Sequence, residues 1–261
     1  MNQKLSFGFI GGGRIARLLL KALKQRNALP EKVVVADPNE NMKKQVQAID
    51  TAVIKCVNNN VDVLNVDILF LAVHPPVVKD MTAEISGKIG ANTLVVSLIP
   101  VISIEKLTAM LGGVTKLARM IPNAPSIIHK GYNPVVYSAD INSDEKQQLQ
   151  QLFSYWGEAP EVDERKLEAY AIVTAMGPTY FWFQWLKLRE LGKQFGMSDA
   201  ELKKAIPAML HGATETLFES DLSPKEVLDL IPVCPLKDDE SEIQDIFEKK
   251  LNGLYAKLTQ K

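Results

Sequence analysis

The sequence predicts an α/β protein in which an N-terminal Rossmann domain, with a doubly wound and mostly parallel sheet, precedes an all-helical domain. Two observations support this prediction. As far as about residue 162, short β-branched runs alternate with helical periodicities, which is typical of βαβ units with right-handed crossovers. Beyond that point the β-branched runs disappear and helical periodicity dominates. We therefore expect two domains, residues 1–162 and 163–261.

The first element of this pattern is the stretch LSFGFIGGGRIA, residues 5–16. A short apolar run leads into three glycines and then into a helical pattern, which is the order of a dinucleotide-binding strand, turn and helix. Gly11 permits the tight turn, Gly13 lets the backbone approach a pyrophosphate, and the small Ala16 lets helix and strand pack closely. Amide groups at the start of the helix then face the phosphates. A glycine-rich turn without a ligand is the structural alternative.

Further elements follow in alternation along the predicted Rossmann domain. The run at 67–73 is continuously apolar, as expected of a strand buried on both faces of a parallel sheet. Other strands are expected at 32–36, 52–57, 94–99, 116–121 and 132–137. Helices are expected at 14–25, at 40–48, after Pro75-Pro76 and near 103–111.

The predicted helical domain has five periodic segments, at 164–175, 178–195, 199–219, 223–230 and 240–258. The second of them carries Phe181, Trp182 and Trp185 among other apolar residues, more than one face of a small bundle needs. A thick core is one explanation. We expect instead that this domain forms a homodimer, because obligate interfaces are strongly apolar.

Composition and charge exclude several classes of function. The 261 residues include 30 basic and 31 acidic ones, for a net charge of −1, so we expect neither a nucleic-acid nor a membrane partner. Two cysteines and no signal peptide or membrane span favour a cytoplasmic protein. The three histidines lack ligand spacing, so we expect no metal, and His211 is expected to be buried on its helix.

Asp37, at the end of the second predicted strand, is the second determinant of the cofactor. An acidic residue at this place accepts hydrogen bonds from the adenosine ribose and repels a 2′-phosphate, so NAD is favoured. NADP remains an alternative, because Lys43 and Lys44 follow and can meet a phosphate. Asp37 also has a structural explanation, as the first residue of a turn with Pro38 and Asn39.

Several segments together resemble the pyrroline-5-carboxylate reductases over nearly the whole chain. They are FGFIGGGRIA, the asparagine-rich CVNNNVDV, DILFLAVHPP, RMIPNAPSIIHKG at 119–131 and GPTY at 177–180. The resemblance implies a Rossmann domain, a helical domain that dimerises by interleaving, and an active site between them. The implied reaction is hydride transfer from a reduced nicotinamide cofactor to a cyclic imine, which gives proline.

The resemblance also implies which residues bind the cofactor. Those at the pyrophosphate are Gly11, Gly13, Arg14 and Ile15, with Asn59 on the adenosine side. Those at the nicotinamide and its ribose are Ala72, His74, Pro75, Asn123 and Pro125. His74 stands where the family has a lysine. Asn123 has an alternative role, since a Pro-Asn pair suits a turn without any ligand.

The substrate half departs from the family pattern. Met176 replaces the serine that precedes the glycine of GPAY, here Gly177, and a thioether cannot donate a comparable hydrogen bond. The family's glycine- and threonine-rich loop for the substrate carboxylate reads CPLKDDE here, with Lys237 as the remaining cation. Ile99-Pro100-Val101 replaces a small-residue turn. Candidate catalytic residues are therefore Thr174, Met176, Gly177 and Lys237.

Three functional hypotheses follow. The first is an NAD(P)H-dependent oxidoreductase acting on a small imine or carbonyl substrate, with pyrroline-5-carboxylate itself a poor substrate. The second is a non-catalytic dimer that senses the dinucleotide. The third is a related dehydrogenase of hydroxy acids or of a deazaflavin cofactor. The fold alone does not separate them.

Overall fold

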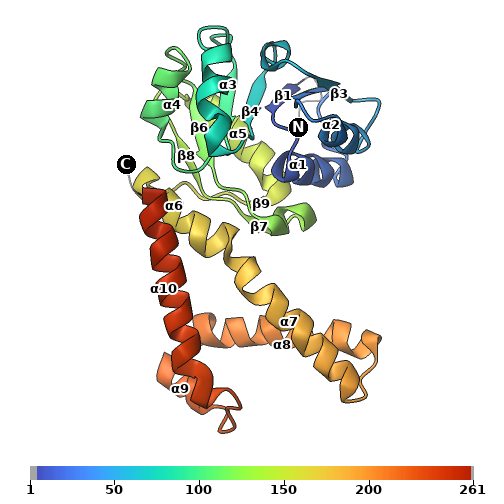
Figure 1. The fold of residues 1–261 in the computed structure, drawn as a ribbon, viewed down its shortest axis with the longest axis vertical. Coiled ribbons are helices and arrows are strands. Elements are labelled where there is room, and N and C mark those ends of the chain that lie inside the picture. The colour runs from blue at the N-terminus through green and yellow to red at the C-terminus, as the bar shows by residue number, and fades with distance from the viewer. Residues whose placement is uncertain (1–4, 260–261) are drawn as a thin grey trace. The chain divides into compact units, whose positions relative to one another are not determined.

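The computed structural model describes residues 5–259, which form two compact units (Figure 1). The first unit runs as far as Met176 and includes the chain again from Tyr255. The second unit is Gly177–Leu254.

The first unit is built on a seven-stranded sheet with the strand order β3-β2-β1-β4-β5-β6-β8. All neighbouring pairs are parallel except β6 with β8. The direction of winding reverses between β1 and β4, as in a Rossmann fold, so the predicted fold class is confirmed. The strands are β1 Ser6–Ile10, β2 Lys32–Ala36, β3 Ile54–Val57, β4 Ile68–Leu71, β5 Leu94–Ser97, β6 Leu117–Met120 and β8 Val135–Tyr137.

Helices cover both faces of this sheet, and each face has its own apolar core. One core includes residues of α1, α2 and α5, and the other includes residues of α3 and α4. Burial on both faces explains why β4 is apolar throughout. The helices are α1 Arg14–Gln25, α2 Glu40–Gln47, α3 Val78–Ile85, α4 Ile104–Met110 and α5 Ser143–Phe153.

Two features of the first unit differ from the sequence prediction. The strand expected at 132–137 is split at Asn133-Pro134: β7, Gly131–Tyr132, pairs with β9, Gly157–Glu158, in a separate small sheet, whereas β8 pairs with β6. Helix α5 was not predicted at all. Its start carries a capping box, in which the Asn142 side chain accepts from the Glu145 amide and the Glu145 carboxylate accepts from the Asn142 amide.

Trp156, near the end of the α/β part of the chain, packs against its first helix, α1. The side chain is fully buried, stacks on Phe153 with 5.8 Å between ring centroids, and meets Phe70 edge-on at 6.0 Å. Its indole Nε1–H donates to the carbonyl oxygen of Leu19 in α1, at 3.0 Å. The first helix of the chain is therefore held by a residue 137 positions later.

The segment expected to be one helix at 164–175 has three helical geometries in succession. A 3₁₀ turn, η5 Glu164–Lys166, leads into α6, Leu167–Tyr170, and then into a π-helix, η6 Ala171–Ala175. The Met176 amide donates to the Ala171 carbonyl oxygen at 3.0 Å, which is the wider hydrogen bond of π geometry. Single π turns occur frequently at functional sites.

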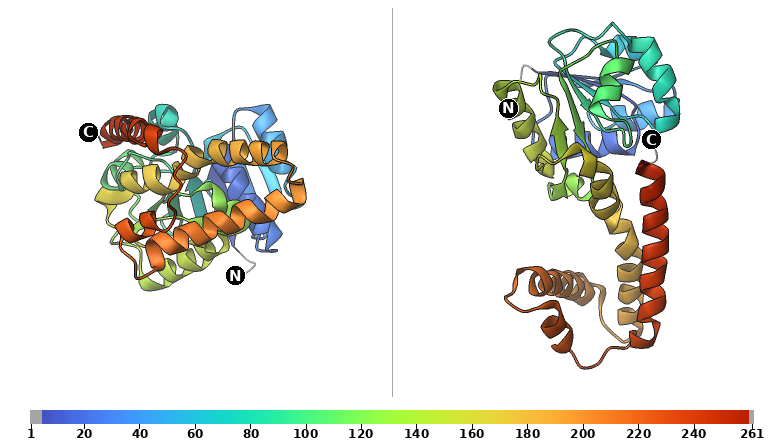
Figure 2. Two further views of the ribbon diagram at one scale, coloured as in Figure 1. Left: turned by 90° about the horizontal axis from the view of Figure 1, so that it is seen from below. Right: turned by 90° about the vertical axis from the view of Figure 1, so that its left-hand side faces the viewer.

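The second unit is entirely helical, as predicted, and its helices can be followed in the two further views of the chain in Figure 2. Gly192 of α7 lies close to the Leu202 side chain of α8. Phe247 of α10 packs against Tyr180 and Phe181 of α7. The elements are α7 Gly177–Gln194, α8 Asp199–Glu219, α9 Pro224–Asp229, the 3₁₀ turn η7 Lys237–Asp239, and α10 Glu240–Thr259, which runs on beyond this unit.

Apolar side chains of the second unit are mostly exposed in the single chain. Among its apolar residues, all of which are described, only Leu202 is buried. Phe183 is 65% exposed and Phe218 is 78% exposed. The prediction of a buried His211 is wrong: its side chain is 77% exposed and lies 3.2 Å from the Glu215 carboxylate one helical turn on.

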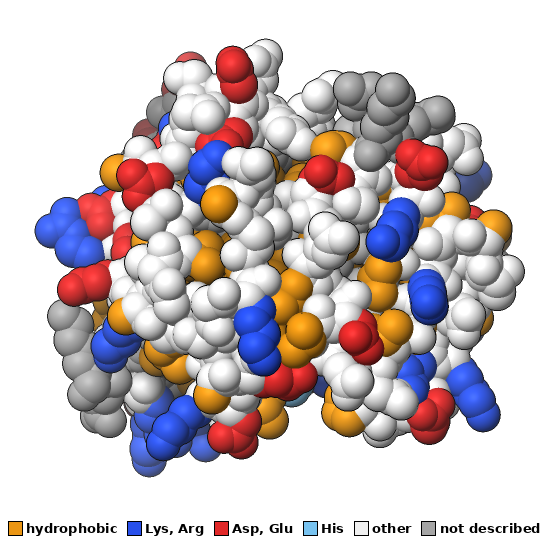
Figure 3. Space-filling model, turned by 90° about the horizontal axis from the view of Figure 1, so that it is seen from above, with side chains coloured by type: hydrophobic (Ala, Val, Ile, Leu, Met, Phe, Trp, Pro, Cys, Tyr) orange, Lys and Arg blue, Asp and Glu red, His pale blue; other side chains and the backbone are white. Residues whose placement is uncertain are grey.

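Within residues 5–259 no helix combines the length and apolar character needed to span a bilayer. On the face in Figure 3, lysine and arginine side chains are interspersed with aspartate and glutamate side chains.

Candidate functional site

The glycine turn after β1 is held tightly between two neighbouring strands. Gly11 has a φ of +100°, and a Cβ built on it would lie 2.5 Å from the Ala72 carbonyl oxygen. Its amide donates to the Ala36 carbonyl oxygen at 2.8 Å. Only glycine fits such a position, both for its backbone conformation and for the lack of space.

Gly13 contrasts with Gly11, because it borders open space. A Cβ built on Gly13 would meet nothing within 4 Å, and its φ of −66° is ordinary for any residue. Gly13 is the N-cap of α1, and no side chain of the described residues caps this helix. The first amide groups of a helix have no partner within it. A pyrophosphate therefore fits here, on uncapped amides at the positive end of the helix dipole.

Asp37 joins the glycine turn to the end of β2. Its Oδ2 accepts from the Gly12 amide and its Oδ1 from the Asn39 amide, both at 2.8 Å. The carboxylate thus orders both its own turn and the glycine loop. Each carboxylate oxygen has a second lone pair, so hydrogen bonds from ribose hydroxyls remain available.

The segments after β3 and β4 reach the same edge of the sheet. Asn59 is exposed and is the N-cap of the 3₁₀ turn η1, Asn60–Val63. Ala72 donates its amide to the Ile10 carbonyl oxygen at 2.8 Å, which places the end of β4 beside the glycine turn. His74 is exposed, and Pro75 opens the 3₁₀ turn η2, Pro75–Val77. The carboxyl edge of the central strands is where open α/β sheets bind ligands.

Asn123, after β6, lies in a buried polar cluster. Its amide N–H donates to Asn133 Oδ1 at 3.0 Å, and its own Oδ1 accepts from the Tyr132 amide at 3.2 Å. Its Nδ2 donates to the Thr174 carbonyl oxygen at 3.4 Å. Pro125 lies in the following 3₁₀ turn, η3 Ala124–Ile128. The Asn123 side chain therefore orders the loop after β6 and ties it to the π-helix.

The loop after β5 is held by a buried ion cluster that the sequence analysis missed. Arg119 in β6 is 2% exposed and pairs with Glu164 at 2.8 Å and with Glu168 at 2.7 Å. The same carboxylate oxygens accept the Ile104 amide at 2.8 Å and the Val101 amide at 3.0 Å. An arginine inside the short buried strand LARM was the available signal, because a buried charge requires partners.

The candidate catalytic residues are divided between the two units. Thr174 and Met176 belong to the first unit, and the Thr174 hydroxyl donates to the Tyr170 carbonyl oxygen at 2.7 Å. Gly177, the first residue of α7, and Lys237 belong to the second unit. Among the residues of the structure as described, no three histidine, cysteine or acidic side chains gather as a metal-ligand set.

Several known proteins are similar to this chain in sequence. A family model described as NADP oxidoreductase, coenzyme F420-dependent, matches residues 6–100, which span β1 to β5. The pyrroline-5-carboxylate reductase of Corynebacterium melassecola is 24% identical over 254 residues, covering 96% of this chain and 93% of the relative. Pyrroline-5-carboxylate reductase 2 of Bos taurus is 26% identical over 229 residues, covering 86% of this chain and 72% of the relative.

Solved structures extend the likeness to the whole fold. The Plasmodium falciparum pyrroline carboxylate reductase with NADP bound has a TM-score of 0.78 at 20% identity, covering 98% of this chain and 96% of that one. The Streptococcus pyogenes 1-pyrroline-5-carboxylate reductase has a TM-score of 0.77 at 16% identity, covering 98% and 99%. The chain is therefore similar to pyrroline-5-carboxylate reductases in sequence and in fold over nearly its whole length. It is accordingly an NAD(P)-dependent oxidoreductase with a nicotinamide dinucleotide site.

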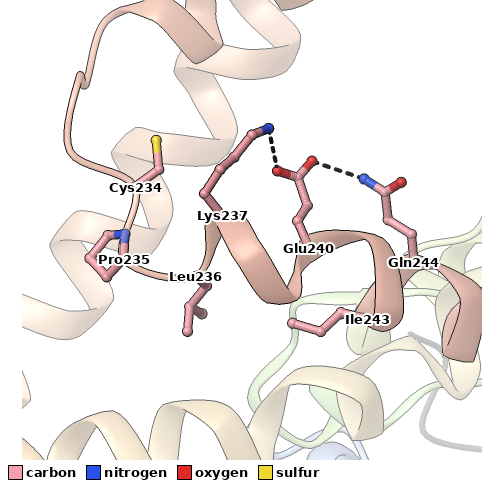
Figure 4. A pocket seen from close by; sticks show the side chains of 7 residues that line it. All are labelled: Cys234, Pro235, Leu236, Lys237, Glu240, Ile243 and Gln244. Atoms are coloured by element: carbon pink, nitrogen blue, oxygen red, sulfur yellow. Dashed lines mark hydrogen bonds and ion pairs between the residues drawn. The ribbon is translucent and has the colours of Figure 1, made fainter.

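The segment CPLKDDE forms an open turn at the start of α10 (Figure 4). Lys237 Nζ donates to Glu240 Oε2 at 2.8 Å, and Gln244 donates to the other Glu240 oxygen at 2.9 Å. The bond to Glu240 raises the pKa of Lys237, which stays charged but already has an anionic partner. The turn borders a hollow of about 360 Å³, lined by Cys234, Pro235, Leu236, Lys237, Glu240, Ile243 and Gln244.

Proposed function

We propose that this protein reduces the C=N bond of a small imine with NADH and that pyrroline-5-carboxylate is a poor substrate for it. The dinucleotide part of the proposal rests on the open space at Gly13, in front of the uncapped start of α1 and beside the Asp37 carboxylate. The imine substrate rests on the similarity to pyrroline-5-carboxylate reductases. The bound reduced nicotinamide supplies the hydride. The residues of the chain bind and orient it, and an imine that arrives protonated needs little further acid catalysis.

The preference for NADH over NADPH rests on Asp37 and on the state of the nearby lysine. The carboxylate repels a 2′-phosphate. Of the two lysines that follow, Lys43 is not free to compensate, because it is largely buried, lies 2.5 Å from Glu40 Oε1 and donates to Asn58 Oδ1. Lys44 is exposed and is the lysine that leaves NADPH as the alternative. An Asp37→Ser variant is expected to narrow or reverse the preference. Tighter binding of NADPH than of NADH by the unmodified protein, measured by fluorescence titration, would contradict this part.

The poor use of pyrroline-5-carboxylate follows from the substrate half of the chain. Met176 offers no hydroxyl donor, and Lys237 is already paired with Glu240. Losing a hydrogen bond to a charged group costs about 1.5–3 kcal/mol, so two such losses lower kcat/KM by at least about 100-fold. Steady-state reduction with a kcat/KM above ~10⁴ M⁻¹s⁻¹, the ordinary enzyme range, would contradict the expectation.

The dinucleotide site is tested most directly at Gly13. Gly13→Val leaves the fold intact, because its Cβ points into open space, but places a side chain where the pyrophosphate binds. We expect NADH affinity to fall by about 100-fold or more, in line with the loss of several charge-assisted hydrogen bonds. Gly212→Val is the matched control, since its Cβ also meets nothing within 4 Å. Equal affinity of the Gly13→Val and unmodified proteins would reject the site.

A second candidate function comes from the family model. Its description names coenzyme F420, a deazaflavin, and it matches residues 6–100, the part that holds the proposed dinucleotide site. A screen of NADH and NADPH oxidation with cyclic imines, oxo acids and a deazaflavin separates the candidates. Turnover of the deazaflavin alone would favour the second candidate, and tight NADH binding without any turnover would favour a sensor.

We also propose that the helical domain, residues 163–261, makes a homodimer, and that residues 1–162 form the dinucleotide-binding domain. Support comes from the exposed aromatic side chains of α7, including Phe181 and Trp182. Light scattering is expected to give about twice the chain mass of 28.9 kDa. Trp182→Glu should shift the protein to the monomer, whereas Ile128→Glu, at an exposed apolar residue of the first unit, should not. A monomer in the unmodified protein at micromolar concentration would remove the proposal.

A further inference from the structure

Val101, in the loop after β5, has a backbone conformation that suits glycine and not valine. Its φ is +75°, and a β-branched residue is rarely found in that region because its branched Cβ crowds the backbone. Pro100 precedes it, and a proline followed by a residue with positive φ is the pattern of a type II turn, where glycine is the usual choice. A strained residue of this kind persists only when its surroundings hold it, and such residues cluster at functional sites.

The surroundings that hold Val101 are the buried ion cluster of β6 and α6. Glu168 accepts the Val101 amide at 3.0 Å while pairing with Arg119 at 2.7 Å. Ile104 follows Val101 by three residues, and its amide donates to Glu164. Arg119 is 2% exposed, so this anchor lies within the protein and fixes both ends of the turn. The conformation of Val101 is therefore imposed by tertiary contacts.

Packing of the Val101 side chain does not account for the strain. The residue is 38% exposed, so its methyl groups are not filling the core. The loop follows β5, which lies between β4 and β6 in the sheet. The segments after those two strands carry His74 and Asn123, the residues proposed for the nicotinamide side of the cofactor. A strained, exposed valine thus stands at the carboxyl edge of the sheet between the two proposed nicotinamide loops, where ligands bind in this fold.

We propose that Val101 determines substrate specificity, by presenting its two methyl groups to the imine at the carboxyl edge of β5. This inference rests on the proposed function and names its substrate class: imines whose substituent on that side is uncharged. The methyl groups offer an apolar contact to such a substituent. They also exclude water and donors from a charged substituent, and an unpaired carboxylate at an apolar surface binds poorly.

The test compares two imines that differ in the charged group alone, 1-pyrroline and pyrroline-5-carboxylate. The unmodified protein should favour 1-pyrroline in kcat/KM. Val101→Ala keeps the Cβ and the backbone conformation but removes both methyl groups, and should reduce that preference by about ten-fold or more. Val101→Gly should do the same, with NADH affinity unchanged in both variants. Val61→Ala is the matched control, because Val61 is 39% exposed on the proposed adenosine side.

An equilibrium measurement separates this inference from the proposed function. Calorimetric titration of the NADH-loaded protein with pyrrolidine and with proline, the reduced forms of the two probes, reports the same preference without turnover, because neither amine can accept a hydride. Val101→Ala should bring the two affinities closer together. If Val101→Ala leaves both ratios as in the unmodified protein, Val101 is not a specificity residue. If neither imine is reduced, the proposed function fails, and the binding ratio alone decides the role of Val101.

Discussion

The two units of this chain bury their apolar residues to very different extents. The first unit encloses an apolar core on each face of its sheet and a third, smaller cluster, whereas the second unit buries Leu202 alone among its apolar residues. Large exposed apolar patches mark interaction sites. The difference indicates that the first unit is self-sufficient and supports the proposal that the second is stabilised by association.

The largest expected effect compares one phenylalanine from each unit. Phe70 is fully buried and stacks on Phe9 with 4.5 Å between ring centroids, so Phe70→Ala should lower the free energy of unfolding by about 3–5 kcal/mol. Phe183 is 65% exposed, and Phe183→Ala should leave the stability of the separate chain within about 0.5 kcal/mol. Denaturant unfolding at several protein concentrations measures both.

The dependence of unfolding on protein concentration is the control for these two variants. Under the homodimer proposal, Phe183→Ala changes how the unfolding midpoint depends on protein concentration, whereas Phe70→Ala costs the same at every concentration. Equal, concentration-independent losses for the two variants would show that the second unit closes its own core.

The second prediction concerns the buried charge of the first unit. Arg119→Met leaves the Glu164 and Glu168 carboxylates without their cation, and removing one partner of a buried pair costs about 3 kcal/mol or more. The variant should also weaken discrimination between the two pyrrolines, because the turn at Val101 loses its anchor. Chemical denaturation and the same pair of substrates measure the two consequences. Unchanged stability would mean that the cluster is not a structural anchor.

The third prediction tests how closely α7 and α8 pack. A Cβ on Gly192 would lie 2.4 Å from Leu202 Cδ2, so Gly192→Ala should cost about 1–3 kcal/mol by overpacking. Gly212 in α8 has open space around its Cβ, and Gly212→Ala should stabilise by up to about 1 kcal/mol, because alanine favours a helix. Thermal unfolding of the two variants side by side measures both signs, and a stabilising Gly192→Ala would show that α7 and α8 separate readily.

The smallest effect on stability is expected at Asp199, which lies at the centre of an exposed ion cluster in the second unit. Hydrogen bonds from Lys193 and Arg189, with Lys203 nearby, lower the pKa of this carboxyl below its ordinary value. A lowered pKa contributes stability above the unfolded pKa of about 3.9, and that contribution is lost as pH falls further. Asp199→Asn should therefore be slightly less stable than the unmodified protein at pH 7, and the gap should close below pH ~4. A gap that widens on acidification would contradict this assignment.

The sequence predicted the elements that depend on local chemistry and missed those that depend on distant partners. The glycine turn, Asp37 and the apolar β4 were predictable, since each is specified by residues within one strand–turn–helix segment. The ion cluster at Arg119 was not, because its partners lie 45 and 49 positions away. The positive φ of Val101 is likewise imposed by Glu168, and no periodicity distinguishes the π turn from an α-helix.

Two misses have separate causes. The capping box at Asn142 and Glu145 was visible in the sequence, and its helix was overlooked because that segment has few apolar residues. His211 was expected to be buried because its helix carries neighbouring apolar residues, but that helix exposes them as well. Pattern reasoning assumes that an apolar face has a partner within the same chain, and the second unit does not meet that assumption.

The bond from Trp156 to Leu19 has a consequence for how this protein is made. The first helix leaves the ribosome early, but the residue that closes on it follows 137 positions later. At ordinary synthesis rates this interval is on the order of ten to thirty seconds. Until it ends, the inner face of α1 and the rings of Phe7 and Phe70 lack their last covering layer. During this interval the growing Rossmann half exposes apolar surface, and partly folded chains of this kind are prone to aggregation.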